Sequence, residues 1–234
     1  MQILSRDSLT LGGFAGIKEH RLVTDSRIFG SRKKPEASEG LGSMVYLADA
    51  KYDPMGESGM HPHSEIDVIS VVLEGRVSHE GSLEHGQNLV AGDVQVQRAG
   101  GEGFDHNEIN PDSSKNRMLQ IWALPEESGQ CASYKSYTPS LHGTTRIYGG
   151  KKNQDKTFDS HTIIEIAHLQ VGEQLVSSGE QLTYVISGES TFSEVESGEE
   201  KARLVAKEGD LVRGVNTTIT AQSQLHLLVI REQS

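Results

Sequence analysis

The sequence predicts an all-β protein built from two tandem β-barrel units. Three observations carry this prediction: short β-type runs separated by turn residues, an internal repeat, and the lack of any long amphipathic helical pattern. The chain of 234 residues contains 25 glycines but only five Phe and one Trp, which is typical of a protein rich in turns. Regularly spaced short strands with turn signals between them indicate a sandwich or a barrel.

The expected strands follow one another along the chain. Near the N-terminus, RLVTDSRIFG and LGSMVYLADAKYDP are expected to be strands that lead into the first barrel, with the basic loop SRKKPEASEG solvated between them. From about residue 65 the runs are DVISVVLEG, RVSHEGS, QNLVAGD, VQVQRAGG and RMLQIWALP. Each run is rich in β-branched or apolar residues and ends at a turn residue, as expected for a strand.

Two segments of the chain resemble each other. VISVVLEGRV followed by LVAGDVQV corresponds to LTYVISGEST followed by LVAKEGDLV. Each copy has a β run, a Gly turn at Gly75 or Gly188, a polar hairpin and a Gly-Asp turn. The repeat predicts two copies of one unit, an N-terminal barrel over residues 1–135 and a C-terminal barrel over 136–234. A linker is expected around 131–145, where the chain reads CASYKSYTPSLHGTT.

Composition excludes several classes of function. The net charge of -11 argues against direct nucleic-acid binding and against binding to an anionic membrane surface, because both need a basic surface. No apolar run approaches the roughly 20 residues of a membrane span, and the N-terminus lacks the pattern of a signal peptide. The single cysteine, Cys131, rules out an intramolecular disulfide and suits a reducing compartment. We therefore expect a cytoplasmic protein.

Two pairs of candidate metal ligands lie in the first unit. His61 and His63 are separated by one residue, and so are His106 and Glu108. Because side chains alternate along an extended segment, each pair points to one side. Three imidazoles and one carboxylate suit a divalent first-row metal and leave coordination positions open for substrate and dioxygen. Iron(II) is the favoured occupant, and Mn, Ni, Cu and Zn fit the same ligands.

The repeat provides an internal control on these ligands. Counted from the turns, the second-copy counterparts of His61, His63, His106 and Glu108 are Gln174, Val176, Ser223 and Leu225. None of these four is a strong metal ligand. The absence of the set from one copy favours a functional site over a metal kept for barrel stability.

The other histidines show no comparable pairing. His79 and His85 lie on the hairpin after Gly75, and we expect both to be solvated. The histidines beyond residue 135 have no paired spacing; they are His142, His161, His168 and His226.

A family resemblance emerges from these motifs. HPHSEIDVISVVLEGRVSHEGS, AGDVQVQRAGGEGFDHNE and RMLQIWALPEESG resemble the pirin family of bicupins, bacterial pirin-like proteins especially, over most of residues 55–130. The resemblance implies a bicupin fold of two tandem double-stranded β-helix (jelly-roll) barrels. It also implies one metal, usually iron, in the N-terminal barrel and none in the C-terminal barrel. The implied ligands are His61, His63, His106 and Glu108.

Two departures from the family pattern affect the surroundings of the site. AGGEGFDH is one residue longer than the usual AGxGxxH, and Asp67 replaces a Glu of the strand after the histidine pair. Asp67 is expected beside the ligands, where it would orient an imidazole N–H. Gln95, Gln97 and Phe104 are candidate pocket-lining residues; the alternative is a turn residue and two solvent-facing strand positions.

The resemblance implies a metal-dependent dioxygenase of the quercetin 2,3-dioxygenase type. Such an enzyme opens the heterocyclic ring of a small flavonol-like aromatic substrate with O2 and releases carbon monoxide. Glu108 would be both ligand and general base for the 3-hydroxyl group. The alternative is a metal-containing redox sensor or co-regulator that binds a protein partner and turns over no substrate. An enzyme needs a cavity open to the metal, whereas a sensor needs only a metal that changes oxidation state.

Overall fold

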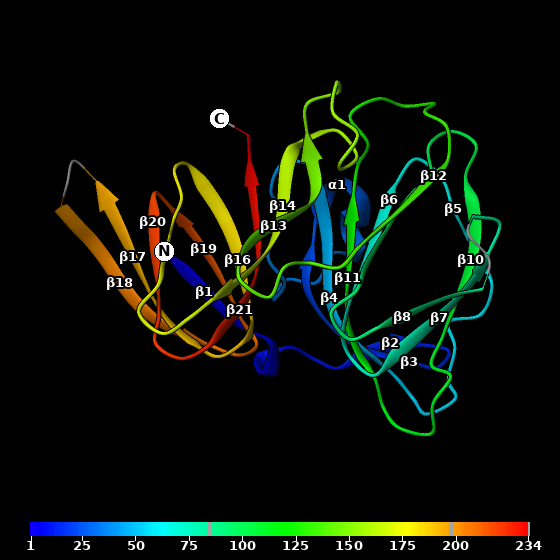
Figure 1. The fold of residues 1–234 in the computed structure, drawn as a ribbon, viewed down its shortest axis with the longest axis horizontal. Coiled ribbons are helices and arrows are strands. Elements are labelled where there is room, and N and C mark those ends of the chain that lie inside the picture. The colour runs from blue at the N-terminus through cyan, green and yellow to red at the C-terminus, as the bar shows by residue number, and fades with distance from the viewer. Residues whose placement is uncertain (84–85, 197–198, 234) are drawn as a thin grey trace. The chain divides into compact units, whose positions relative to one another are not determined.

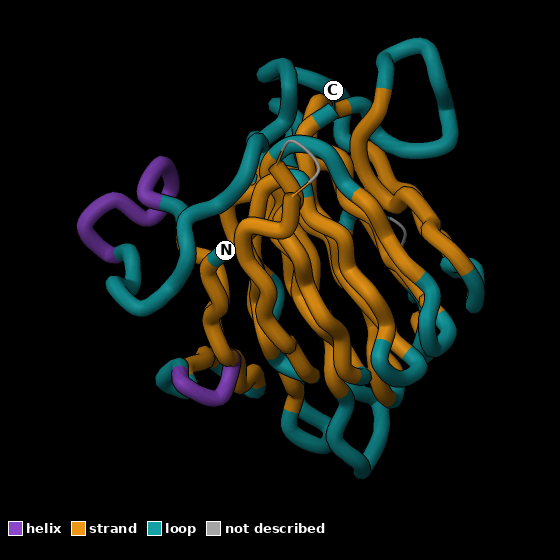
Figure 2. The backbone as a smooth tube through the Cα atoms, turned by 90° about the vertical axis from the view of Figure 1, so that its left-hand side faces the viewer, coloured by secondary structure: helices purple, strands orange, loops and turns teal. Residues whose placement is uncertain are grey.

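The computed structural model describes residues 1–83, 86–196 and 199–233, and strands dominate them. Helical segments are short and lie in connections (Figure 2): the α-helix α1 (Ser26–Phe29) and two 3-10 turns, Arg6–Ser8 and Gly30–Arg32. Within the described ranges no helix has the length and apolar character needed to cross a membrane. The prediction of an all-β protein is confirmed.

The chain forms two units. The N-terminal unit is Leu9–Thr138, and the C-terminal unit combines Met1–Ser8 with Pro139–Ser234. The N-terminal unit ends at Thr138, and the first eight residues of the chain belong to the other unit.

Two edge strands account for this division. β12 (Ser133–Tyr137), in the segment predicted to be a linker, pairs with β9 (Val94–Arg98) of the N-terminal unit. β1 (Gln2–Ser5) pairs with β19 (Asp210–Val215) of the C-terminal unit. Composition alone did not identify these strands because both are short and form only edge contacts.

The N-terminal unit contains two antiparallel sheets (Figure 1). One has seven strands in the order β12-β9-β6-β11-β4-β3-β2, and the other has four in the order β5-β10-β7-β8. Their bounds are β2 (Gly12–Phe14), β3 (Ile17–Thr24), β4 (Met44–Tyr52), β5 (His61–His63), β6 (Asp67–Glu74), β7 (Arg76–Gly81), β8 (Gln87–Val90), β10 (Phe104–Ile109) and β11 (Arg117–Ala123). The sheets pack face to face, since Ser70 of β6 donates a hydrogen bond to Glu108 of β10.

The C-terminal unit repeats this arrangement. Its sheets have the orders β1-β19-β16-β21-β14-β13 and β15-β20-β17-β18. The bounds are β13 (Gly143–Gly150), β14 (Ser160–Leu169), β15 (Gln174–Val176), β16 (Glu180–Ser187), β17 (Glu189–Glu196), β18 (Glu199–Lys207), β20 (Thr217–Ala221) and β21 (Leu225–Glu232). Apolar side chains of both sheets, including Val185, Phe192, Ile219 and Leu227, form one buried cluster. The order β9-β6-β11-β4 matches β19-β16-β21-β14, as expected for two copies of one unit.

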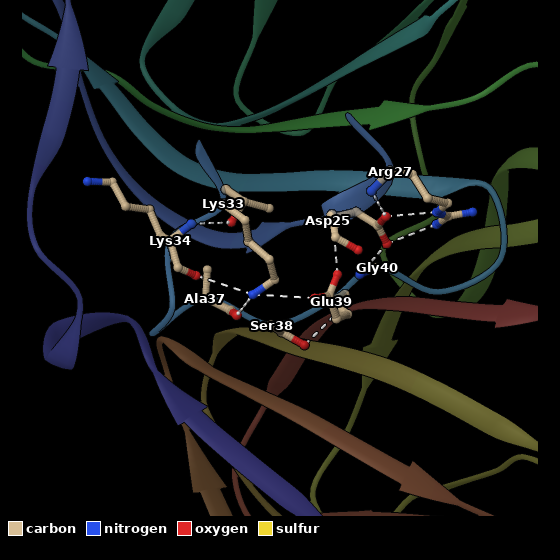
Figure 3. Close-up of polar contacts among 10 residues, drawn as sticks. Asp25, Arg27, Lys33, Lys34, Ala37, Ser38, Glu39 and Gly40 are labelled. Atoms are coloured by element: carbon tan, nitrogen blue, oxygen red, sulfur yellow. Dashed lines mark hydrogen bonds and ion pairs between the residues drawn. The ribbon is translucent and has the colours of Figure 1, made fainter. Parts of the chain in front are cut away.

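The connection between β3 and β4 is tied down by side-chain hydrogen bonds (Figure 3). The Asp25 carboxylate caps α1 by accepting from the backbone N–H of Arg27 at 2.9 Å, and it also accepts from the N–H of Gly40 at 2.9 Å. The Lys33 ammonium donates to the carbonyl of Ala37 at 2.9 Å. This loop, expected to be simply solvated, is therefore anchored by hydrogen bonds around α1.

Candidate metal centre

Three histidines converge between β5 and β10 of the N-terminal unit. The two strands pair antiparallel with His61 opposite His106 and His63 opposite Phe104. Since side chains at alternate positions share a face, the imidazoles of His61, His63 and His106 project to the same side. One ring nitrogen of each lies within 4.8 Å of the others. The structure thus brings together the three histidines that the sequence singled out.

The distances between the ring nitrogens suit a shared metal ion. His106 Nε2 lies 3.0 Å from His61 Nε2 and 3.2 Å from His63 Nε2. Metal–nitrogen bonds of about 2.1 Å place two ligands at right angles about 3.0 Å apart. His61 Nδ1 donates to the Gly59 carbonyl at 2.8 Å and His106 Nδ1 donates to Gln97 Oε1 at 3.0 Å, which leaves their Nε2 lone pairs facing each other. Facing lone pairs repel unless a cation lies between them, so the donor set fits a divalent metal.

Burial disfavours the charged forms of two of these histidines. It lowers the pKa of His63 to about 3, with His106 and His61 adding to the effect and Glu108 opposing it. Burial, with smaller contributions from His61 and His79, also lowers the pKa of His106 to about 3. Neutral imidazoles are the form that binds a metal, so protons do not compete for His63 and His106 near neutral pH.

Glu108, the expected fourth ligand, lies in a cage of hydrogen-bond donors. Its Oε1 accepts from the Ser70 hydroxyl at 2.7 Å and from the Gln95 amide at 2.9 Å, and its Oε2 accepts from the Tyr52 hydroxyl at 3.0 Å. Glu108 is 2% exposed and is not part of the three-histidine group. Burial, followed by the Glu108 charge, raises the pKa of Tyr52 well above its usual value, so Tyr52 keeps its proton. The carboxylate is therefore fixed beside the cluster by three donors.

Gln97 links two histidines inside the unit. While its Oε1 accepts from His106, its Nε2 donates to His79 Nε2 at 2.9 Å, and both Gln97 and His79 are fully buried. The expectation that His79 is solvated is therefore wrong: alternation along β7 puts Val77 and His79 on the inward face. The other histidine of that hairpin, His85, lies outside the described residues.

The remaining pocket candidates lie close to the cluster. The Phe104 ring centroid is 5.3 Å from that of His63 and 5.2 Å from that of His106. Gln95 is fully buried against Glu108. The structure therefore favours inward positions for these side chains over the solvent-facing alternative.

Asp67 has a partner other than the expected imidazole. It forms a buried ion pair with Arg98, with Arg98 Nη2 3.0 Å from Asp67 Oδ2, and the two residues are opposite each other on β6 and β9. Alternation along β6 puts Asp67 on the face opposite to that of Ser70, which contacts Glu108. Asp67 therefore stabilises the pairing of β6 with β9 and does not lie beside the ligands.

Tyr52 and Ser70 were missed by the sequence analysis. Ser70 had a signal, because it is the one polar residue in the apolar run VISVVL and is fully buried. Tyr52 had none, because it comes from the end of β4, and only the packing of the sheets brings it to Glu108.

The C-terminal unit has no histidine at the corresponding inward positions. Gln174 and Val176, the expected counterparts, are exposed, and the inward residue of β15 is Leu175, which packs on the apolar cluster and lies opposite Ile219. The count back from the Gly turn to this strand was one residue out of register. A shift of one residue exchanges the inward and outward faces of a strand. The other two expected counterparts lie beyond β20; they are Ser223 and Leu225. The conclusion that this copy lacks the ligand pairs is unchanged.

The fold and the three-histidine group define a bicupin with a single candidate metal centre of this kind in its described residues. Residues 32–123 match the family model described as Pirin, and this segment contains the three histidines and Glu108. This part of the chain therefore matches the pirin family model, and the resemblance predicted from its motifs is confirmed.

Similar proteins include both enzymes and pirin-like proteins by name. The chain is 38% identical over 97 residues to a quercetin 2,3-dioxygenase of Escherichia coli, covering 41% of this chain and 42% of the relative. It is 40% identical over 76 residues to a pirin-like protein of Caulobacter vibrioides, covering 32% of each. The matched part thus spans less than half the length of these curated relatives.

Solved structures match the whole fold. A bacterial pirin from Escherichia coli in complex with nickel(II) superposes with a TM-score of 0.82 at 21% identity, covering 100% of this chain and 99% of that one. A quercetin 2,3-dioxygenase from Acinetobacter baumannii has a TM-score of 0.71 at 19% identity, covering 100% of this chain and 86% of that one. The bicupin fold predicted from the sequence is confirmed.

Proposed function

We propose that the protein is a cytoplasmic metal-dependent dioxygenase of the quercetin 2,3-dioxygenase type. It opens the heterocyclic ring of a flavonol-like substrate with O2 and releases carbon monoxide. The observation that carries this proposal is the convergence of three imidazoles beside a buried carboxylate that accepts hydrogen bonds from Ser70 and Gln95. The name of the similar Escherichia coli enzyme supports the reaction type.

The cofactor in this proposal is one divalent metal ion, with Fe(II) as the favoured metal. His61, His63 and His106 would hold it through Nε2, because hydrogen bonds to Gly59 and Gln97 occupy Nδ1 of the first and the third. When bound, the metal supplies a positive charge that favours an ionised substrate hydroxyl and a place for O2 to meet the substrate. The nickel(II) in the solved bacterial pirin supports a transition metal in this fold without selecting iron.

Glu108 is the base in this proposal. It would take the proton of the flavonol 3-hydroxyl, and its carboxylate would also be available as a fourth ligand. The Tyr52, Ser70 and Gln95 donors keep the carboxylate oriented throughout. Phe104 covers the His63 and His106 rings on one side and excludes water there.

The test is anaerobic reconstitution with Fe(II), followed by admission of O2 in the presence of quercetin. Oxygen uptake, loss of the flavonol absorbance band and release of carbon monoxide are expected from the native protein and not from His63→Ala. A protein shown by metal analysis to be fully loaded, yet without turnover, would overturn the dioxygenase proposal and favour the redox-sensor alternative with a protein partner.

A further inference from the structure

Trp122 lies on the inward face of β11, next to the candidate metal centre. It is opposite Val68 of β6, which is in turn opposite Gln97 of β9, and residues opposite each other in a sheet share a face. Its ring centroid is 5.8 Å from that of His63, at an interplanar angle of 70°. Trp122 therefore borders the histidine cluster from the seven-stranded sheet.

The indole N–H of Trp122 has no acceptor among the described residues. Its Nε1 is buried, although the side chain as a whole is only half-buried. Buried donors without a partner are rare in native proteins, and each one calls for an explanation such as a ligand or an ordered water. The donor therefore marks a place where an acceptor is missing from the protein itself.

The neighbouring aromatic rings fix the indole without satisfying it. Trp122 stacks on Tyr46 at 4.4 Å and on Phe29 of α1 at 6.3 Å. The Tyr46 hydroxyl donates to Glu19 at 2.6 Å. These contacts hold the ring in place, since the loop that carries Phe29 is itself fixed by Asp25 (Figure 3).

The face of the sheet beside Trp122 is partly exposed. Gln120, the next inward residue of β11, is also half-buried, although its strand lies inside the seven-stranded sheet. Its neighbours across the sheet are the small side chains of Ala48 and Ser70. Partial exposure of these two inward residues shows that solvent reaches this face of the sheet.

We propose that Trp122 is a ligand-binding residue whose indole N–H donates to the carbonyl oxygen of a planar aromatic ligand held at the three-histidine centre. This inference rests on the proposed function, in which the ligand's hydroxyl group binds at the metal. It adds a second contact, between the ligand's carbonyl group and Trp122. The ligand class is an aromatic ketone with a hydroxyl group next to its carbonyl. The ring of Trp122 also provides an apolar surface against which such a ligand packs.

The experiment uses the full chain loaded with Zn(II), which is not oxidised, in the absence of O2. Calorimetric titration compares quercetin with catechin, which keeps the 3-hydroxyl but lacks the ring carbonyl. Trp122→Phe keeps an aromatic ring and removes the N–H, so its quercetin affinity should fall about 3- to 10-fold while catechin affinity is unchanged. Equal losses for both ligands, or unchanged quercetin affinity, would overturn the proposal.

A measurement on the native chain covers the case in which the variant fails to fold. Trp122 is the only tryptophan, so a ¹⁵N-labelled protein gives a single indole N–H resonance. Quercetin should move this resonance downfield and slow its exchange with solvent, and catechin should not. An unmoved resonance at quercetin concentrations that calorimetry shows to be saturating would overturn the proposal.

The two proposals fail separately. Quercetin binding that depends on Trp122, together with no turnover by the Fe(II) protein, would overturn the dioxygenase reaction and leave the binding site supported. Turnover by the Fe(II) protein, together with full quercetin affinity in Trp122→Phe, would support the dioxygenase reaction and overturn the role of Trp122.

Discussion

The two units share a strand order but fill their interiors differently. In the N-terminal unit an inward pair between β5 and β10 is His61 opposite His106, whereas in the C-terminal unit the inward pair between β15 and β20 is Leu175 opposite Ile219. The contrast extends beyond these positions. Gln95, opposite Ser70 on β9, corresponds by register to Val212, opposite Thr183 on β19.

This difference shows what a metal centre in such a barrel requires. The N-terminal unit keeps a polar interior in which every donor and acceptor of the Glu108 cage has a partner, and buried polar groups are stable only when paired in this way. In the C-terminal unit an apolar cluster stands in place of both the ligands and the groups that support them. Since that cluster suffices for the barrel, the histidines of the other unit are explained by function and not by folding.

Removal of a ligand gives the largest expected effect. His63→Ala should lower the metal content from about one ion per chain to near zero, because a three-nitrogen set reduced to two loses its chelating geometry. The matched control is His168→Ala, which removes a half-buried histidine of the C-terminal unit that stacks on His226 at 4.0 Å. Metal analysis after dialysis measures both variants. Equal metal loss in the two would contradict the assignment of the centre to the N-terminal unit.

The stability of the metal-free protein should depend on pH through the same cluster. The pKa of both His63 and His106 falls from an ordinary value of 6.5 to about 3 in the folded state. Between these values the unfolded chain binds protons that the folded chain does not. The free energy of unfolding therefore decreases as pH falls from 6.5 towards 3, by up to about 2.7 kcal/mol per pH unit for two protons.

Trp122 fluorescence measures this effect for the N-terminal unit alone, since the chain has no other tryptophan. Denaturant titrations at several pH values should give a slope that is smaller by at least half in His63→Ala. Identical slopes in the native and variant proteins would contradict the pKa shifts.

Much of this comparison was accessible from the sequence. The motif spacing located His61, His63 and His106, because alternation along a strand is a local property that needs no knowledge of the partner sheet. Gln95 and Gln97 were candidates for the pocket with solvent-facing positions as the alternative, and the structure buries both. The repeat also indicated which copy lacks the ligands, although a one-residue error in register exchanged Leu175 for its exposed neighbours.

The rest depended on packing between distant segments. His79 was taken as solvated because hairpins are usually exposed, but β7 lies between β10 and β8 and is covered by the opposite sheet. The role of Tyr52 depends on a hydrogen bond across 56 positions of sequence. Asp67 was assigned from its place after the histidines, whereas cross-strand pairing with Arg98 determines its environment.

An intermediate effect is expected where a supporting group is altered and the ligands are kept. Gln97→Leu should weaken metal binding about 10- to 100-fold, because His106 Nδ1 loses the acceptor that fixes its tautomer. Gln97→Glu keeps an acceptor at this position and should retain most of the affinity. Competition with a chelator for Zn(II) measures both. Equal loss of metal affinity in the two variants would indicate that Gln97 acts through packing and not by fixing the tautomer of His106.

The smallest change in metal content is expected when histidines are introduced into the C-terminal unit. Leu175→His with Ile219→His, made in the His63→Ala background, should lower thermal stability and bind little metal. The new imidazoles would enter an apolar cluster with no acceptor for their N–H groups, and each unpaired group costs about 1–3 kcal/mol.

The missing acceptor cannot simply be added. Gly214 occupies the position on β19 that corresponds to Gln97, and a Cβ there would lie 2.7 Å from Thr217 Cγ2. A side chain long enough to orient a ligand therefore does not fit without a shift of β20. Metal analysis of the variant tests this argument, and a full equivalent of tightly held metal would show that two inward histidines suffice without the hydrogen-bonding shell.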